Sequence, residues 1–331
     1  MIEGTGAAAM TDEAERPKPR RRLRFSMERA GLVIAIVVLS AVFGVINPNF
    51  FSYTNITNVM RQVSVLAIVS VGQTLAIMLA GIDLSVGSIL GFISVFGATQ
   101  IVSYGIAVGV RLSLLMAALI GAFQGYWIAK FKIPAFIVTL GGLSFLRGAA
   151  YVYSNGMPVP GLPSEFLLLG SGSFVGVPIP AIIACCVYLI FHFMLTSTRT
   201  GRYLYAIGGN EEAAILSGIK VARYKIFAYC MSGLLAGAAS LILTSRVVSG
   251  QPTLGEAFEL QAIAATIIGG TSFAGGEGTL VGTFLGVILM AIIGNGLNLI
   301  RVSSFIQMMV LGAIIVFAVT LDTLQRKKRG K

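Results

Sequence analysis

The chain has 331 residues, of which 56% are hydrophobic and 11% are charged, and its formal net charge is +11. Soluble globular domains carry about 25% charged residues, because a folded surface needs charge to stay solvated. The composition therefore excludes a water-soluble enzyme, and the high hydrophobicity excludes an intrinsically disordered chain. We expect an all-α, polytopic integral membrane protein built as a helix bundle.

Residues 1–29 are polar and basic, and we expect them to form a flexible cytoplasmic arm. Residues 30–322 hold the apolar runs and form the predicted transmembrane domain, and residues 323–331 form a basic cytoplasmic tail. Basic residues flank the apolar runs, as they do in the cytoplasmic segments of membrane proteins. They form no stripe of their own, so we expect no nucleic-acid partner.

A membrane-spanning helix needs about 20 apolar residues, and somewhat fewer where flanking side chains reach the interface. This measure predicts about ten spans, at residues 30–46, 62–80, 86–103, 107–129, 133–153, 178–195, 226–244, 260–273, 280–294 and 304–321. Glycines interrupt the pattern, above all in Gly275-Gly276-Glu277-Gly278. Broken or re-entrant helices over 260–294 are therefore the alternative, with about eight to ten spans.

Ten spans place both ends of the chain in the cytoplasm. The basic segments 130–132 and 196–225 then lie on the same side as the two ends. The loops 47–61, 154–177 and 245–259 face outward, and their basic residues are Arg61 and Arg246. This distribution agrees with the excess of Lys and Arg found in cytoplasmic loops.

Two stretches resemble each other at an offset of 195 residues, Val86–Gly91 and Val281–Gly286. Each follows a glycine-rich break that carries an acid, Asp83 in the first and Glu277 in the second. Paired, glycine-interrupted segments are typical of the repeats of transporters. The alternative is that small residues recur in any tightly packed bundle of membrane helices.

Polar residues inside apolar spans predict a transport pathway or a gate, because such residues are costly in hydrocarbon. The candidates are Gln73, Asp83, Ser85, Asn295 and Asn298. Asp83 is the foremost of them, either as a helix cap together with Ser85 or as a gate near the cytoplasmic end of a span. For each residue, the alternative is a hydrogen bond between helices.

The longest polar stretch in the interior of the chain, residues 196–225, predicts a contact with a soluble partner. Asn210 can cap a short helix that carries Glu211 and Glu212 in its first turn, and Gly218 can end that helix. Its apolar face, formed by Ala214, Ile215 and Ile219, suits docking into a groove of another protein. The alternative is an amphipathic linker that lies on the membrane surface.

The chain is poor in arrangements of side chains that catalysis uses. It contains no GxxxxGK[ST] nucleotide motif, and its single histidine, His192, has no acidic neighbour. The three cysteines lie in or beside apolar runs, without the spacing of metal ligands. We therefore expect no catalytic site, no cofactor and no metal, and nucleotide-driven transport would require a separate ATPase chain.

The sequence Glu212-Ala213-Ala214, followed by Gly218, resembles the E-A-A-x-x-x-G loop of the membrane subunits of ABC importers. The stretch 201–219, together with 81–87 and 268–282, resembles more narrowly the ribose/xylose-type sugar permeases, over about residues 30–322. The Ile-x-Leu-Pro that extends the loop pattern in other importers is absent here. Its absence favours the monosaccharide branch.

This resemblance implies the permease subunit of an ATP-driven importer of a monosaccharide, such as ribose or xylose, in the bacterial inner membrane. It implies three protein partners: a cytoplasmic ATP-binding subunit (often a tandem-cassette chain), a periplasmic or surface sugar-binding protein, and a second permease copy. Membrane lipid surrounds the bundle. By the same resemblance, the residues that couple the loop to the ATPase are Asn210, Glu211, Glu212, Ala213, Ala214 and Gly218.

Two other classes of function stay open from the residues alone. An ion- or proton-coupled secondary transporter should place carboxylates in mid-span, whereas Glu256 and Glu259 fall in predicted loops. A membrane scaffold without a pathway should lack a polar line through the bundle, and the polar candidates above favour a pathway instead.

Overall fold

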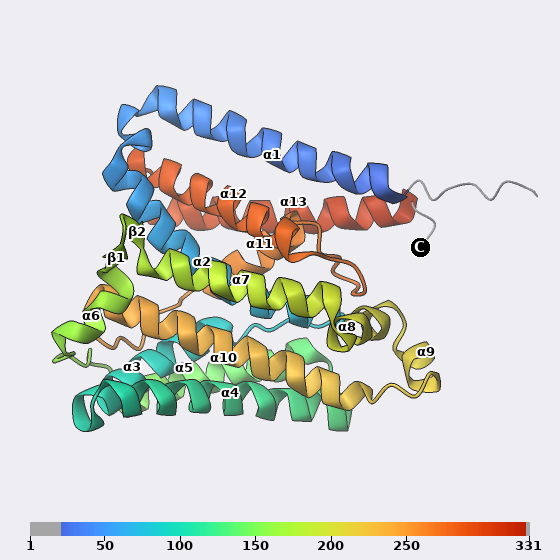
Figure 1. Ribbon diagram of the computed structural model, residues 1–331, viewed down its shortest axis with the longest axis horizontal. Coiled ribbons are helices and arrows are strands. Elements are labelled where there is room, and N and C mark those ends of the chain that lie inside the picture. The colour runs from blue at the N-terminus through green and yellow to red at the C-terminus, as the bar shows by residue number, and fades with distance from the viewer. Residues whose placement is uncertain (1–20, 329–331) are drawn as a thin grey trace, which may run out of the picture.

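The computed structural model describes residues 21–328, and its secondary structure is almost entirely helical (Figure 1). The elements, in chain order, are α1 Arg21–Ile46, η1 Pro48–Phe51, α2 Tyr53–Met78, α3 Val86–Tyr104, α4 Ile106–Phe131, α5 Ala135–Ser154, α6 Ser164–Ser171, β1 Ser173–Phe174, β2 Val177–Pro178, α7 Ile179–Ser197, α8 Arg199–Gly209, α9 Glu211–Leu216, α10 Val221–Val247, α11 Phe258–Ile268, α12 Leu280–Leu299 and α13 Ser304–Lys328. The two short strands pair antiparallel, and η1 is a 3₁₀ turn.

The prediction of an all-α polytopic membrane protein is confirmed. Within residues 21–328, eight helices are long and apolar enough to cross a membrane: α2, α3, α4, α5, α7, α10, α12 and α13. The apolar part of α1 (Ala30–Ile46) and α11 are shorter, so each of the ten predicted spans corresponds to a helix. Helix α1 begins at Arg21 rather than at residue 30, and the rest of the predicted arm, residues 1–20, lies outside the described residues.

Three helices form the centre of the bundle. In the most apolar stretch of each helix, the share of buried residues is 78% in α2, 67% in α3 and 61% in α10. The same share is only 22% in α4 and 17% in α5. Lipid tails are as apolar as leucine, so the outer helices can leave large apolar side chains exposed. Small residues let α4 approach α10 closely, because a Cβ at Gly121 would lie 2.1 Å from the carbonyl oxygen of Tyr229.

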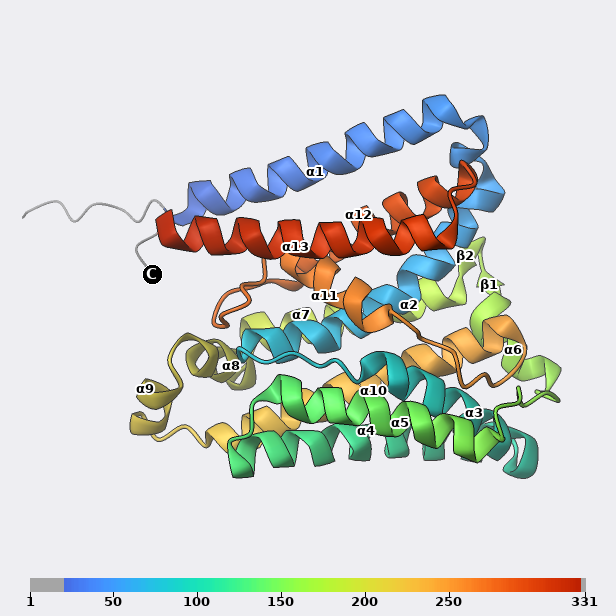
Figure 2. The same ribbon diagram turned by 180° about the vertical axis from the view of Figure 1, so that it is seen from behind.

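Two breaks interrupt the helices inside the bundle. Residues 79–85 run between α2 and α3 without helical structure, and residues 269–279 do the same between α11 and α12 (Figure 2). Beyond the first break, α3 runs parallel to α10, as the hydrogen bonds Ser240 Oγ to Leu90 O (2.6 Å) and Thr244 Oγ1 to Ser94 Oγ (2.7 Å) show. The two stretches that resemble each other in sequence therefore both follow a break in a helical segment.

The bundle has two distinct ends, which we call the α6 end and the α9 end. The α6 end carries η1, α6 and the hairpin β1–β2, and the α9 end carries α8, α9, the first residues of α1 and the last residues of α13 (Figures 1 and 2). The segments predicted to be cytoplasmic thus lie together at the α9 end, as far as the structure describes them. The orientation of the α9 end toward the cytoplasm remains a prediction.

Candidate functional site

The loop that was predicted to meet a soluble partner contains the short capped helix α9. The Asn210 side-chain oxygen accepts a hydrogen bond from the backbone N–H of Ala213 at 2.9 Å, which satisfies one free donor of the first turn. Glu211 and Glu212 lie in that turn, where negative charge is favourable. Gly218 ends the segment with a φ of +78°, a left-handed conformation that glycine adopts without strain.

The outward face of α9 differs from the predicted one. Ala214 is only 4% exposed and Ile219 packs against the main core, so neither is free to meet a partner. Ile215, the third residue of the predicted face, is exposed at 52%, and Leu216, which was not part of that face, is exposed at 89%. The reason is that α9 folds back onto the bundle, where Lys225 Nζ of α10 lies 2.7 Å from the Glu211 carboxylate.

One contact of α8, the helix before α9, with the bundle involves backbone atoms alone. We call this place the glycine junction, and it consists of Gly208, Met78 and Gly276. The backbone N–H of Gly276 donates to the carbonyl of Met78, the last residue of α2, at 2.9 Å. A Cβ at Gly208 would lie 1.8 Å from that carbonyl oxygen and 2.5 Å from Gly276 N. Only glycine allows α8 to approach both breaks this closely.

A side-chain hydrogen bond supports the same contact one turn earlier in α8. The Tyr205 hydroxyl donates to the carbonyl of Gly278 at 2.8 Å. Burial raises the pKa of Tyr205 above its ordinary value, so the hydroxyl keeps its proton at neutral pH and stays a donor. Helix α8, and α9 directly after it, are therefore tied to the end of α2 and to the loop 269–279.

Asp83 lies in the first break, fully buried, and holds the start of α3 against α10. Its Oδ1 accepts from the backbone N–H of Ser85 at 3.0 Å and from Ser85 Oγ at 2.6 Å, and its Oδ2 accepts from Ser232 Oγ at 2.7 Å. Ser85 Oγ also lies 2.9 Å from the amide oxygen of Gln124 in α4. A buried carboxyl group requires such partners, so the predicted pairing of Asp83 with Ser85 is present and extends to two further helices.

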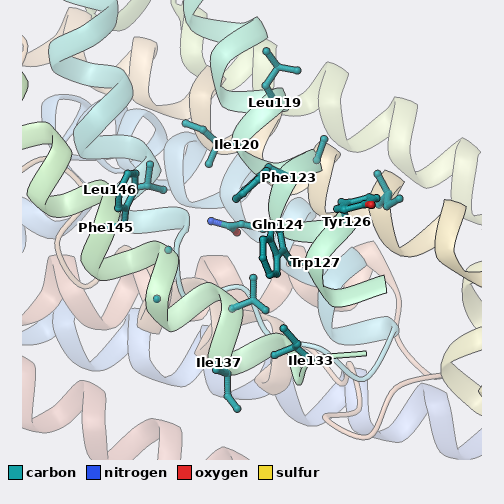
Figure 3. Close-up of a pocket in the computed structure, with 15 residues that line it drawn as sticks. Leu119, Ile120, Phe123, Gln124, Tyr126, Trp127, Ile133, Ile137, Phe145 and Leu146 are labelled. Carbon is teal, nitrogen blue, oxygen red and sulfur yellow. The ribbon is translucent and has the colours of Figure 1, made fainter. Parts of the chain in front are cut away.

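Gln124 separates this polar cluster from a groove between α4 and α5. The groove has a volume of about 960 Å³, and Figure 3 shows the Gln124 amide between the apolar side chains that surround it. These include Phe123, Trp127, Ile137 and Phe145, several of which are exposed to the surroundings of the bundle. The Gln124 side chain therefore lies between the apolar groove and the buried cluster around Asp83.

Arg147 of α5 fastens the loop before α11 to the bundle. Its Nη1 donates to the carbonyls of Pro252 (2.6 Å) and Leu254 (3.2 Å), and its Nη2 donates to that of Gly87 (3.3 Å). Glu259, which was expected in a loop, lies in the first turn of α11. Its carboxylate lies so close to Gly87 that a Cβ added there would be 2.0 Å from Glu259 Oε2. The planar guanidinium holds three carbonyls that belong to two separate segments.

The remaining predicted residues do not gather in one place. Gln73 is fully buried in α2, and neither of its amide atoms has a hydrogen-bond partner among the described residues. Asn295 exchanges two hydrogen bonds of 2.9 Å with Asn55 and so links α12 to α2. Asn298 accepts from Gln307 at 2.9 Å, and both line a cavity of about 350 Å³ between α2, α11, α12 and α13.

The sequence indicated a break at Gly276, but it singled out neither Gly208 nor Met78, nor the contact among the three. Gly208 and Gly276 each stand next to a second glycine, and that pairing is the available signal for a close backbone approach. The sequence does not tell which member of the pair makes the contact. Tyr205 also gave no signal, because tyrosine is ordinary at a membrane surface.

The chain is similar to permeases over nearly its whole length. A family model described as "Branched-chain amino acid transport system / permease component" matches residues 55–319. The ribose import permease protein of Haemophilus influenzae is 42% identical over 304 residues, covering 90% of this chain and 94% of the relative. That of Bacillus subtilis is 43% identical over 315 residues (93% and 97%), and the D-allose transport system permease protein of Escherichia coli is 35% identical over 321 residues (95% and 97%). No solved structure matches the chain.

Proposed function

The chain belongs to the family of branched-chain amino acid transport system permease components, and from this membership we propose that it carries a monosaccharide across the bacterial inner membrane. It is the membrane-spanning subunit of an ATP-driven importer. The sugar class follows the relatives, which are named for ribose and D-allose. The observation that carries the proposal is the capped helix α9, whose exposed side chains stand at the end of the bundle next to the glycine junction.

ATP hydrolysis belongs to a partner chain, because this sequence has no nucleotide-binding motif of its own. The coupling residues are Asn210, Glu211, Glu212, Ala213, Ala214 and Gly218. Asn210 and Gly218 fix the two ends of α9, and Ala214 anchors it to the bundle. Ala213, which is exposed, meets the ATPase.

The importer also needs a sugar-binding protein on the outer side and a second copy of this permease. Closure of the ATPase cassettes moves α9, and α8 transmits that movement to Met78 and Gly276 at the two breaks. The bundle then switches between outward- and inward-facing packing. Gln73, Asp83, Ser85, Asn295 and Asn298 act along this pathway or hold its gate.

The experiment measures ATPase binding and sugar transport for the same variants. We expect Ala213→Trp to abolish co-purification of the ATPase subunit with the permease and to abolish ATP-dependent sugar uptake in proteoliposomes. Ala41→Trp, on the exposed side of α1, serves as the matched control and should preserve both. Uptake that persists without ATP and collapses with an ionophore would show a secondary transporter instead, and unchanged ATPase binding in Ala213→Trp would refute the role of α9.

A further inference from the structure

A cavity of about 440 Å³ lies at the α9 end, where five segments of the bundle meet. It is half-open and is lined by the first break after α2, the end of α4 with the loop that follows it, the start of α5, α9 and α10. The lining residues are Leu79, Ala80, Gly81, Ile128, Lys132, Ile133, Pro134, Ala135, Glu211, Glu212, Ile215, Lys225 and Tyr229. We call this cavity the α9 chamber. Its volume falls in the range of about 300–1,000 Å³ that small-molecule sites occupy.

We propose that the α9 chamber binds the transported sugar, a neutral molecule rich in hydroxyl groups, on its way out of the bundle. This inference rests on the proposed function and names a site for its substrate. Charged side chains of both signs line the chamber, including Glu212 and Lys132, and apolar ones such as Ile128 and Pro134 line it as well. A sugar has the matching chemistry, because its hydroxyls both donate and accept while its carbon faces are apolar.

The inner end of the chamber holds a hydroxyl group that needs a partner. Tyr229 is 1% exposed, and its hydroxyl has no hydrogen-bond partner among the described residues. A Cβ at Gly81 would lie 2.3 Å from that hydroxyl oxygen, so the group rests directly on the backbone of the first break. A buried hydroxyl left unpaired is costly. Its oxygen is fully covered in this position of α9, so a sugar hydroxyl pairs with it only when the chamber opens further.

The chamber wall includes the helix that meets the ATPase. Glu211, Glu212 and Ile215 belong to α9, and the ion pair between Glu211 and Lys225 crosses from α9 to α10. A displacement of α9 therefore changes the shape of the chamber. By thermodynamic linkage, a sugar that fits the chamber better in one position of α9 also favours that position. Helix α9 thus both contacts the ATPase and forms part of the last sugar site on the pathway.

Two adjacent residues of α9 offer a matched test. Ile215 lines the chamber, whereas Leu216 does not and is 89% exposed. We label two single variants, Ile215→Cys and Leu216→Cys, with a charged maleimide, each in the complex with the ATPase subunit. Mass spectrometry of the digested protein then gives the labelling rate of each cysteine separately. We expect millimolar D-ribose to slow the labelling of Ile215→Cys severalfold and to leave Leu216→Cys unchanged. Equal rates with and without D-ribose at both positions would overturn the proposal.

A second pair of variants tests the hydroxyl. In the Ile215→Cys background, Tyr229→Phe should raise the D-ribose concentration that gives half-protection about three- to tenfold, because one hydrogen bond is lost. Tyr188→Phe is the control, since it removes another buried, unpartnered hydroxyl that lines a different cavity. An identical shift in both variants would refute the assignment. Sugar uptake is measured in parallel, so that normal uptake without protection disproves the chamber while leaving the proposed function intact.

Discussion

Replacement of Gly208 by alanine tests whether the glycine junction transmits the movement of α9. The new Cβ would lie 1.8 Å from the carbonyl oxygen of Met78 and 2.5 Å from the backbone nitrogen of Gly276. These atoms belong to a backbone hydrogen bond of 2.9 Å and cannot rotate away as a side chain would. The substitution therefore forces the backbone of α8 away from both breaks.

Three terms set the magnitude. Overpacking of a filled site costs about 1–3 kcal/mol, and loss of the hydrogen bond between Gly276 and Met78 costs about 1 kcal/mol more. Alanine in place of glycine inside a helix offsets about 1 kcal/mol. The net cost is about 1–3 kcal/mol. If it falls on one of the two transport states, their ratio changes about 5- to 150-fold.

Gly209 provides the matched control, because a Cβ at this position would meet nothing within 4 Å. Both variants are reconstituted with the ATPase subunit, and ATP hydrolysis and sugar uptake are measured in the same proteoliposomes. We expect Gly208→Ala to lower the number of sugars taken up per ATP, while Gly209→Ala behaves as the parent chain does. Equal uptake per ATP in the two variants would refute the reasoning.

Three further substitutions follow from the hydrogen bonds of the site. Asn210→Ala removes the cap of α9, which costs about 1 kcal/mol of helix stability, so uptake per ATP should fall and Asn210→Asp should restore it. Ser232→Ala leaves one oxygen of Asp83 without its donor, which costs about 1–3 kcal/mol, and the unfolding temperature in detergent should drop; an unchanged temperature would contradict the contact. Arg147→Lys loses the planar fork that holds three carbonyls, so backbone amide exchange over residues 250–257 should accelerate, and unaltered exchange would argue against a fastening role.

Much of the fold could be predicted from hydropathy, because each long apolar run has to bury its backbone polar groups within one helix. The capped helix α9 was also predictable, since Asn210 and Gly218 carry out functions that depend only on neighbouring residues. Helix caps of this kind involve residues that are close together in the sequence. It does not require knowledge of what lies across the bundle.

The rest of the site depends on contacts between distant segments. Asn295 was predicted beside the pathway, but its partner is Asn55, 240 residues earlier in the chain. Gly208 makes the close approach and Gly209 does not, although the sequence presents them as a pair. Ala214 belongs to the apolar face of α9 by helical spacing, yet that side turns toward the bundle. Such differences arise from how α8 and α9 fold back, which no local pattern specifies.

The hydrogen bond between Asp83 and Ser232 also constrains how the protein is made. Ser232 follows Asp83 by 149 residues, which ribosomes add in roughly 7–30 s at about 5–20 residues per second. During that interval, the acid of the first break has been synthesised but its partner helix α10 has not. An isolated carboxyl group is costly in hydrocarbon, so the Asp83 carboxyl group needs water or another partner until α10 arrives. The centre of the bundle can therefore close only after α10 has been synthesised.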